Sequence, residues 1–429
     1  MAEDERAGKP RAERVRTAVR GFAVDASPLR ASRDYRRIWL GMLVSELGHQ
    51  FALVATYVQV TQLTGSPAAV GAIGLFGFVA LVVGTLVGSS FVDAYDRRTI
   101  LIFSQVGYMA ASGTLLLGAL HGDPPIGLVY GAVALIAALS AIDLPTRSAM
   151  TPRLVGRELL PSALALNQVV WNGTALLGPA LAGITIARLG LAWAYAIDVV
   201  TYLAMLAAAI SIGRMPPERS GRTASGVAAV REGFAYLRGR RVLQSTFAID
   251  IVAMVFGMPR ALFPILAVTQ FNRGAGIVGL LFAAPAVGAV AGALAGGWVS
   301  RIRHQGMAVI WAVVLWGAGI AAFGLVSHHL WLGLLLLAVA GAADVVSAVF
   351  RSTILQLSVP DTLRGRLSGI HILVVTGGPR LGDLEAGLVA QAFSPTVSVV
   401  SGGLLCIAGA GLVAWLVPAF RRYHAGEAA

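Results

Sequence analysis

Long apolar stretches, each bounded by turn residues or charges, recur along almost the whole sequence from residue 37 onward. A helix needs about 20 mostly apolar residues to cross the hydrocarbon core of a membrane. We therefore predict an all-α membrane protein with twelve transmembrane helices, at residues 37–62, 68–92, 99–120, 125–146, 162–187, 191–212, 242–269, 276–300, 307–327, 330–350, 366–392 and 395–419.

Charge is scarce in this chain and is mostly arginine. Charged residues make up 13% of the 429 residues, against roughly 25% in soluble domains. Lys9 is the only lysine, and the net charge is +12. The arginines lie at the ends of apolar stretches rather than along one exposed face. A membrane surface therefore explains them better than a nucleic acid does.

The arginines are concentrated in alternate loops. Loops on the side of the N-terminus hold nearly all of them, and the opposite loops hold only Arg188 and Arg273. By the positive-inside rule, both termini and the central loop are expected in the cytoplasm. The predicted organisation is a disordered tail at 1–34, a six-helix bundle at 35–212, a linker at 213–241, a second six-helix bundle at 242–420 and a tail at 421–429.

The central linker contains a pattern typical of a helix. Val227, Val230, Phe234 and Leu237 recur at helical spacing, with arginines elsewhere around the helix. This pattern predicts a short amphipathic helix in the headgroup region of the membrane.

The two halves of the sequence resemble each other. Arg147-Ser148 aligns with Arg351-Ser352 at an offset of 204, and Gly178-Pro179 aligns with Gly378-Pro379 at an offset of 200. We therefore expect two like bundles related by a pseudo-two-fold axis. Such a duplication places a substrate site near the membrane midplane between the halves.

The segment GSSFVDAYDRR at 88–98 resembles the loop signature of the major facilitator superfamily. Gly88, Asp93, Arg97 and Arg98 match this signature, and Ala94 stands where an arginine is common. The segments TPRLVGRELLPSALALNQ, EGFAYLRGRRVL and AIDIVAMVFGMPRALFP look like the bacterial branch that includes the enterobactin exporter, the transmembrane secretion effectors. The resemblance implies the major facilitator fold and a bacterial inner membrane.

The resemblance also implies a conformational latch at this loop. Asp93 is then expected to meet the positive N-terminal end of the eleventh helix, where an anion is stabilised. Arg97 and Arg98 are expected to pair with carboxylates or lipid phosphate. The alternative is a charge cluster that only sets the topology.

The fifth expected span, WNGTALLGPALAGI, is similar to a motif of drug–proton antiporters. Gly173, Gly178, Pro179 and Gly183 carry the similarity, and Ala182 replaces a glycine. Small residues at these spacings equally fit close helix packing. The motif favours export without excluding a purely structural role.

Ionisable residues inside membrane spans are costly and usually functional. Glu46, His49 and Gln50 form a polar stripe on one face of the first span. Glu46 and His49 are candidates for proton coupling, because both side chain types can exchange protons, and Gln50 is a candidate for the substrate cavity. A Glu46 bonded to a neighbouring span would give the same pattern.

Four further charges lie in the seventh and eleventh spans. Asp250 and Arg260 are ten residues apart and too distant to pair with each other. Arg380 and Asp383, three residues apart, can form a local ion pair. Asp250 and Asp383 are proton-coupling candidates, and Arg260 and Arg380 are substrate-cavity candidates. Structural pairing is the alternative for all four.

Other side chains in the spans have simpler explanations. Asp143 and Arg147, one turn apart, indicate a structural pair. Trp171, Phe256 and Tyr202 could line a pocket, and Trp171 is a substrate-cavity candidate. Aromatic residues in spans are more often packing or interface residues.

Two classes of function are excluded or disfavoured by missing motifs. A phosphate-binding loop needs a lysine after its glycines, and Lys9 is the only one, so the chain itself cannot drive transport with ATP. No His-Glu-x-x-His motif occurs, His328-His329 has no nearby carboxylate, and Cys406 is the single cysteine. We expect no metal, no cofactor and no enzymatic activity.

The sequence thus predicts a secondary active transporter that exports a hydrophobic or amphipathic small molecule, such as a siderophore or an antibiotic, by proton antiport. Its expected partners are the substrate, protons and membrane lipid, with no nucleic acid, and the chain is expected to be a monomer. The alternatives are a proton-coupled importer and a membrane sensor that does not transport.

Overall fold

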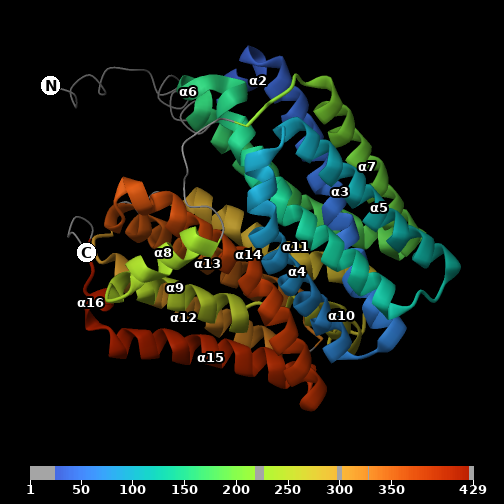
Figure 1. Ribbon diagram of the computed structural model, residues 1–429. Helices are drawn as coiled ribbons and strands as arrows, with labels where there is room; N and C mark the ends of the chain where they lie inside the picture. The colour runs from blue at the N-terminus through green and yellow to red at the C-terminus, as the bar shows by residue number, and fades with distance from the viewer. Residues whose placement is uncertain (1–24, 218–226, 297–301, 327, 425–429) are drawn as a thin grey trace, which may run out of the picture.

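The computed structural model describes residues 25–217, 227–296, 302–326 and 328–424. The long elements in these ranges are all helices, which confirms the expected all-α class (Figure 1). The first half contains α2 Ser27–Ala31, α3 Arg33–Thr64, α4 Pro67–Ala94, α5 Arg97–His121, α6 Ile126–Leu189 and α7 Leu191–Ser211.

The central linker contains α8 Val227–Leu237, and the second half begins after it. The second half contains α9 Arg241–Phe256, the 3-10 turn η2 Arg260–Leu262, α10 Phe263–Thr269, α11 Ala275–Ala295, α12 Gln305–Leu325, α13 Leu330–Ser358, α14 Asp361–Ala392, α15 Pro395–Leu416 and α16 Pro418–Arg421.

Large apolar side chains cover the outside of these helices. Trp331 is 78% exposed, Trp415 75% and Leu325 70%. So much apolar surface is unfavourable in water but ordinary against lipid. Ten helices among the described residues are long and apolar enough to cross a membrane. The chain is therefore a multi-span membrane protein.

The twelve expected spans and these ten helices differ in two places. The element α6 is 64 residues long and contains both the fourth and the fifth expected spans. Gly156 interrupts it with φ 76° and ψ 173°, a conformation that favours glycine. The eleventh expected span lies in α14, where Arg380, Asp383 and Glu385 interrupt the apolar run. The count of twelve spans stays a prediction.

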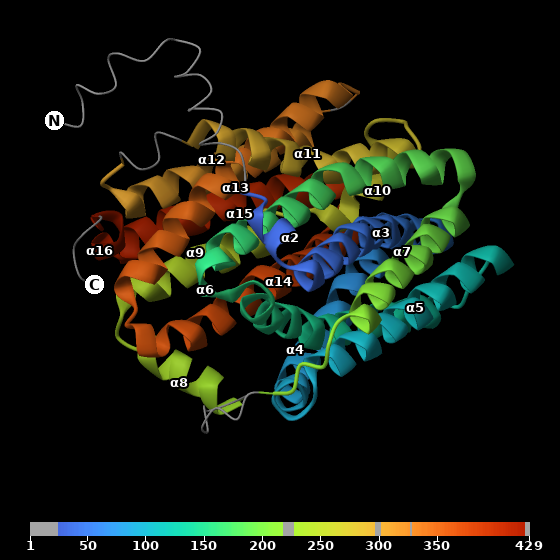
Figure 2. The same cartoon turned by 90° about the horizontal axis from the view of Figure 1, so that it is seen from above.

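The helices of each half pack mainly among themselves. In the first half α3 contacts α6 and α7, and in the second half α12 contacts α13 and α15. Most contacts between the halves join α4 with α14 and α6 with α11. Figures 1 and 2 show the first half on one side, the second half on the other, and α4 beside α14 between them.

Equivalent positions in the two halves make equivalent contacts. A Cβ atom added at Gly178 would lie 2.5 Å from Cβ of Gln50, and one added at Gly378 would lie 2.7 Å from Cβ of Met254. Gln50 and Met254 are themselves 204 residues apart. This shared packing agrees with the duplication that the sequence repeat predicts.

The ends of the chain differ partly from the prediction. Residues 27–31 and 33–34 are helical, although a disordered tail is expected through residue 34. The reason is local, because Pro28 lies in the first turn of α2 and Ser32 caps α3 by accepting a hydrogen bond of 3.2 Å from Tyr35 N. Residues 1–24 and 425–429 lie outside the described residues.

A helix is present where the linker pattern predicts one, at α8. Leu237 at its end is buried in a cluster with Leu243, Phe247 and Leu367 of the second half. At this end the helix therefore packs on protein rather than in lipid headgroups. The side chains of Val227, Val230 and Phe234 lie outside the described part of the chain.

Candidate functional site

A cavity of about 320 Å³ lies between the two halves. That volume falls at the lower end of the range of roughly 300–1,000 Å³ that is common for small-molecule sites. Helices α3 to α7 form one wall, and η2 and α14 form the other. Its polar and aromatic lining consists of Ser45, Glu46, His49, Thr56, Tyr57, Tyr108, Ser140, Asp143, Arg147, Trp171, Tyr202, Arg260, Thr376 and Arg380.

Two carboxylates share one guanidinium group in the first wall. Arg147 Nη1 lies 3.3 Å from Glu46 Oε1, and Arg147 Nε lies 2.7 Å from Asp143 Oδ2. Gln105 also donates a hydrogen bond to Asp143, at 3.4 Å. The expected Asp143–Arg147 pair is present, and Glu46 joins it from the neighbouring helix. One negative charge is left without a cation, so binding of one proton would make the cluster neutral.

The seventh expected span is broken where it reaches the cavity. Helix α9 ends at Phe256, and the chain passes Pro259, which has no N–H group to donate, before η2 begins. The freed carbonyl of Gly257 accepts a hydrogen bond of 2.9 Å from Trp316 Nε1. Irregular backbone at membrane depth is tolerated where it is buried in protein or lines a cavity. The break brings Arg260 to the cavity wall.

Asp383 joins the broken span to the first half of the molecule. Its Oδ1 accepts from the backbone N–H of Ala261 at 3.1 Å, and its Oδ2 accepts from the Tyr57 hydroxyl at 2.5 Å. Arg260 Nη2 lies 3.4 Å from the same Oδ2. The local ion pair expected between Arg380 and Asp383 is not found among the described contacts. The free amide at the helix break and the Tyr57 hydroxyl hold the carboxylate instead.

A second buried cluster lies in the second half, outside the lining of the cavity. Arg351 Nη2 lies 2.9 Å from Asp250 Oδ1 and 3.7 Å from Asp344 Oδ1, and His371 Nδ1 lies 3.7 Å from Asp250 Oδ2. The side chains of Arg351 and Asp250 are 2% and 1% exposed. The cluster again has two carboxylates and one guanidinium group. The two clusters correspond in sequence, because Glu46 to Asp250 and Arg147 to Arg351 are both steps of 204 residues.

Five of the predicted site residues line the cavity together: Glu46, His49, Trp171, Arg260 and Arg380. They come from both halves and from four separate elements. The sequence therefore predicted residues on both walls of the candidate site and the Asp143–Arg147 pair, although not the partners of Glu46 and Arg260.

Three predicted site residues lie elsewhere. Gln50 packs against Gly178 of α6 and is not part of the lining. Asp250 lies in the second buried cluster, and Asp383 lies behind Arg260 and Tyr57. Asp250 and Arg260 do not pair with each other, as the spacing predicts.

Tyr57 is one of several lining residues that sequence reasoning missed, as is Tyr108. Tyr57 follows Glu46 by eleven residues, which is about three helical turns. Leu53 and Tyr57 therefore continue the Glu46–His49 face, and both line the cavity. Extending the helical stripe by two turns would have found Tyr57.

The predicted latch residues lie at the turn between α4 and α5. Arg98 donates hydrogen bonds to the carbonyl groups of Ala209 at 3.1 Å and Ile210 at 2.6 Å, at the end of α7. Arg97 donates to the Ala149 carbonyl at 3.4 Å. Among the described residues, the partners of this basic pair are backbone carbonyl groups rather than the expected carboxylates. The last carbonyl groups of a helix have no partner within it and attract cations.

The other two predicted latch residues, Gly88 and Asp93, both belong to α4. A Cβ atom at Gly88 would lie 2.5 Å from Ile142, so this glycine lets α4 approach α6 closely. Asp93 belongs to α4, and its side chain lies outside the described part of the chain. The proposed contact between Asp93 and the eleventh helix stays a prediction.

The antiporter-like motif lies where α6 crosses α11. A Cβ atom at Gly183 would lie 2.9 Å from the Cα atom of Gly279, and the carbonyl of Pro179 also faces Gly279. Gly71 of α4 meets Gly387 of α14 in the same way, with an added Cβ atom 3.0 Å from Cα. Gly173 has no neighbour within 4 Å of an added Cβ atom. Glycines thus form both close crossings between the halves.

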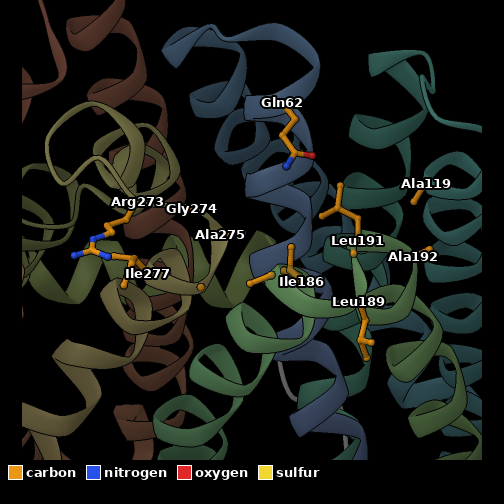
Figure 3. Close-up of a pocket in the computed structure, with 13 residues that line it drawn as sticks. Gln62, Ala119, Ile186, Leu189, Leu191, Ala192, Arg273, Gly274, Ala275 and Ile277 are labelled. Carbon is orange, nitrogen blue, oxygen red and sulfur yellow. The ribbon is translucent and has the colours of Figure 1, made fainter.

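A second hollow, of about 750 Å³, lies at turns near the ends of α3, α6 and α7 (Figure 3). Gln62 and Arg273 are its only polar side chains, and Figure 3 shows the Arg273 guanidinium pointing away from Gln62. It combines no carboxylate with a cation, so the cavity between the halves is the better candidate site.

Sequence comparison connects the chain to one family. The transmembrane secretion effector family matches residues 23–425. An enterobactin exporter of Citrobacter koseri is 26% identical over 408 residues, which cover 94% of this chain and 96% of that protein. The enterobactin exporter of Shigella boydii is also 26% identical over 408 residues, with the same shares covered.

Structure comparison finds the same arrangement of helices in known transporters. A peptide transporter POT structure has a TM-score of 0.71 at 10% identity, covering 90% of this chain and 96% of that one. The nucleoside transporter NupG has a TM-score of 0.66 at 14% identity, covering 90% and 98%. A bacterial homolog of the lysosomal transporter Spinster also has 0.66 at 14%, covering 92% and 97%. At these identities the likeness concerns the fold.

Proposed function

Because the chain belongs to the transmembrane secretion effector family of the major facilitator superfamily, we propose that it is a proton-coupled exporter of an amphipathic small molecule. Membership makes it a membrane transporter with a small-molecule substrate. Export is supported by the family description and by relatives that are named exporters. A siderophore or an antibiotic is a fitting substrate, and at 26% identity enterobactin itself is one candidate among several.

The observation that carries the proposal is the Glu46–Arg147–Asp143 cluster in the cavity wall. Two carboxylates bound to one guanidinium group have a site for one proton, and Glu46 is both in this cluster and in the lining. A substrate group that donates a hydrogen bond to Glu46 would compete with that proton. Such competition is what exchange of substrate for protons requires. His49, on the same face, and the buried Asp250 and Asp383 are secondary candidates.

The contacts between the halves support alternating access. The close crossings join the first part of α4 to the last part of α14, and the last part of α6 to the first part of α11. We refer to this end, with Gly71, Gly183, Gly279 and Gly387, as the closed end. By the arginine distribution it faces away from the cytoplasm, both termini are cytoplasmic, and the protein lies in the bacterial inner membrane.

The proposal is tested in two steps. A strain that lacks the gene is grown with siderophores, under iron limitation, and with amphipathic antibiotics, to find compounds whose tolerance depends on this protein. Everted membrane vesicles with an acidic interior then receive such a compound, and acridine orange fluorescence reports release of protons. Wild-type vesicles should release protons, whereas Glu46→Gln vesicles with equal protein content should not.

Glu385→Gln is the matched control, because Glu385 is another carboxylate of a helix in the membrane that does not line the cavity. This variant should behave like the wild type. Uptake that needs no pH gradient, or normal coupling in Glu46→Gln, would show that the proposed coupling is wrong.

A further inference from the structure

On the second wall two arginines line the cavity beside a single carboxylate, whereas Glu46 and Asp143 on the opposite wall both bind Arg147. Arg260 comes from the broken span and Arg380 from α14. Their neighbour Asp383 is buried and already bound by Ala261 N, Tyr57 and Arg260. Two guanidinium groups and one carboxylate leave one positive charge without a counter-ion on this wall.

The unpaired charge belongs to Arg380. It makes no hydrogen bond or ion pair with any residue that the structure describes, although it faces the cavity. Among the described residues, the Nε atom of Arg260 is also buried and has no hydrogen-bond partner. A cation at membrane depth is costly unless an anion, a dipole or water compensates it. The cavity itself is the place from which a compensating group can come.

Glycines of the neighbouring helix make room for Arg380. A Cβ atom at Gly77 of α4 would collide with Arg380 Nη1, so this glycine provides the space that the guanidinium group occupies. One helical turn away, Gly74 accommodates the Arg380 carbonyl in the same manner. The close approach of α4 and α14 therefore leaves the Arg380 guanidinium group a space against the Gly77 backbone.

We propose that Arg380, with Arg260 beside it, is an anion-binding subsite and that the substrate is a small organic acid. This inference deepens the proposed function, because it takes the cavity as the substrate site. The planar fork of a guanidinium group matches a carboxylate or a similar planar anion. Trp171 and Tyr108 on the opposite wall offer apolar and aromatic surface to the body of such a molecule.

The two walls then have separate roles. An anion at Arg380 does not compete with a proton at Glu46, so the anion-binding wall selects the substrate and the wall with two carboxylates couples it. The substrate needs a second contact, a hydroxyl or amine donor at Glu46, which proton binding displaces.

Binding can be measured without transport and without knowing the natural substrate. The full-length protein in lipid nanodiscs is titrated by equilibrium dialysis with 2-naphthoate, with its neutral analogue 2-naphthamide, and with the cation 2-naphthylmethylamine. Naphthoate should bind about ten- to a hundredfold more tightly than the amide, the usual strength of a hydrogen bond to a charged group. The amine should bind least.

Three variants locate the effect. Arg380→Gln should abolish the preference for naphthoate, and Gly77→Ala should reduce it without changing any charge, because it displaces the guanidinium group. Arg273→Gln makes the same charge change outside the cavity lining and should keep the full preference. Thermal unfolding of each variant confirms that it is folded.

The outcomes separate this inference from the proposed function. Equal binding of naphthoate and naphthamide, no naphthoate binding, or an unchanged preference in Arg380→Gln overturns the anion-binding subsite, even if proton-coupled transport of a neutral compound is found. A preference for naphthoate that depends on Arg380 upholds the subsite, even if the pH gradient has no effect on transport.

Discussion

Arg147 and Arg351 show how single side chains organise the interior of this protein. Each lies between two carboxylates, and each reaches a partner 101 residues earlier in the sequence, Glu46 or Asp250. Long-range ion pairs of this kind join separate helices and compensate charges that would be costly in the membrane. The first cluster lines the cavity, so it suits proton exchange. In the second cluster the Arg351–Asp250 pair is buried outside the cavity lining, so this pair suits stability.

Replacing Arg351 by Met should destabilise the protein by about 3–5 kcal/mol, because two carboxylates lose their buried cation. The unfolding temperature of the detergent-solubilised protein measures this loss. The double variant Arg351→Met with Asp250→Asn should recover part of the stability, since it removes one uncompensated charge. An unfolding temperature equal to that of the wild type in the single variant would contradict a structural role for this pair.

At the scale of single elements, helix ends and helix crossings depend on a few specific contacts. Asp96 caps α5, because its Oδ1 accepts from Arg98 N at 2.9 Å, and its Oδ2 accepts from Met215 N at 2.8 Å. The conspicuous charges of the loop signature therefore serve α5 and the end of α7 in this conformation. The predicted contact of the latch with the eleventh helix belongs to Asp93, a different residue of the same signature.

Asp96→Ala should lower stability by about 1 kcal/mol, the usual contribution of an N-cap side chain. Asp96→Asn keeps an oxygen for the Arg98 N–H group and should lose less. Thermal unfolding of the two variants, compared with the wild type, measures the difference. The capping role would be refuted if the alanine variant were as stable as the asparagine variant.

Gly183→Val should separate α6 from α11, because even a Cβ atom at this position would lie 2.9 Å from Gly279 Cα. The expected result is opening of the closed end, read as faster maleimide labelling of Val278→Cys in a Cys406→Ala background. Val278 is buried beside this crossing. Gly173→Val is the matched control, since an added Cβ atom there has no neighbour within 4 Å. Equal labelling rates in the two variants would show that the crossing is not a close contact.

At the scale of the whole molecule, the halves meet through few polar contacts at the closed end. Tyr57 donates to Asp383, and Ser66 donates to Gln391 at 2.8 Å. The other close contacts there include the glycine crossings and the rings of Tyr57 and Phe282, whose centroids lie 5.5 Å apart. An interface with few polar contacts can separate without breaking many hydrogen bonds, as the proposed alternating access requires.

Linking Ser66→Cys to Gln391→Cys with a short bifunctional methanethiosulfonate reagent should therefore stop transport, and a reducing agent should restore it. Each single cysteine variant, treated with the same reagent, should stay active. Full transport in the linked protein would show that this end does not need to open. The only native cysteine, Cys406, is buried and is replaced by alanine for this experiment.

The sequence by itself determined the class of the protein, most of its helices and its family. Apolar stretches of sufficient length can only be helices in a membrane, because a spanning segment must satisfy its own backbone hydrogen bonds. The internal repeat was also detectable in the sequence. Its offset of 204 relates Glu46 to Asp250 as well as Arg147 to Arg351. Spacing along one helix also identified the Glu46–His49 face, because the geometry of a helix depends only on neighbouring residues.

Apart from the local Asp143–Arg147 pair, only the tertiary structure decided which charges pair. Spacing allows Arg380 to pair with Asp383, yet Asp383 binds Arg260, Tyr57 and the Ala261 amide, and Arg380 is left facing the cavity. Which arginine binds Asp383 depends on how α14 is rotated against α4 and on where the seventh span breaks. These are set by packing between residues hundreds of positions apart, such as Gly74 and Arg380, and no local pattern encodes them.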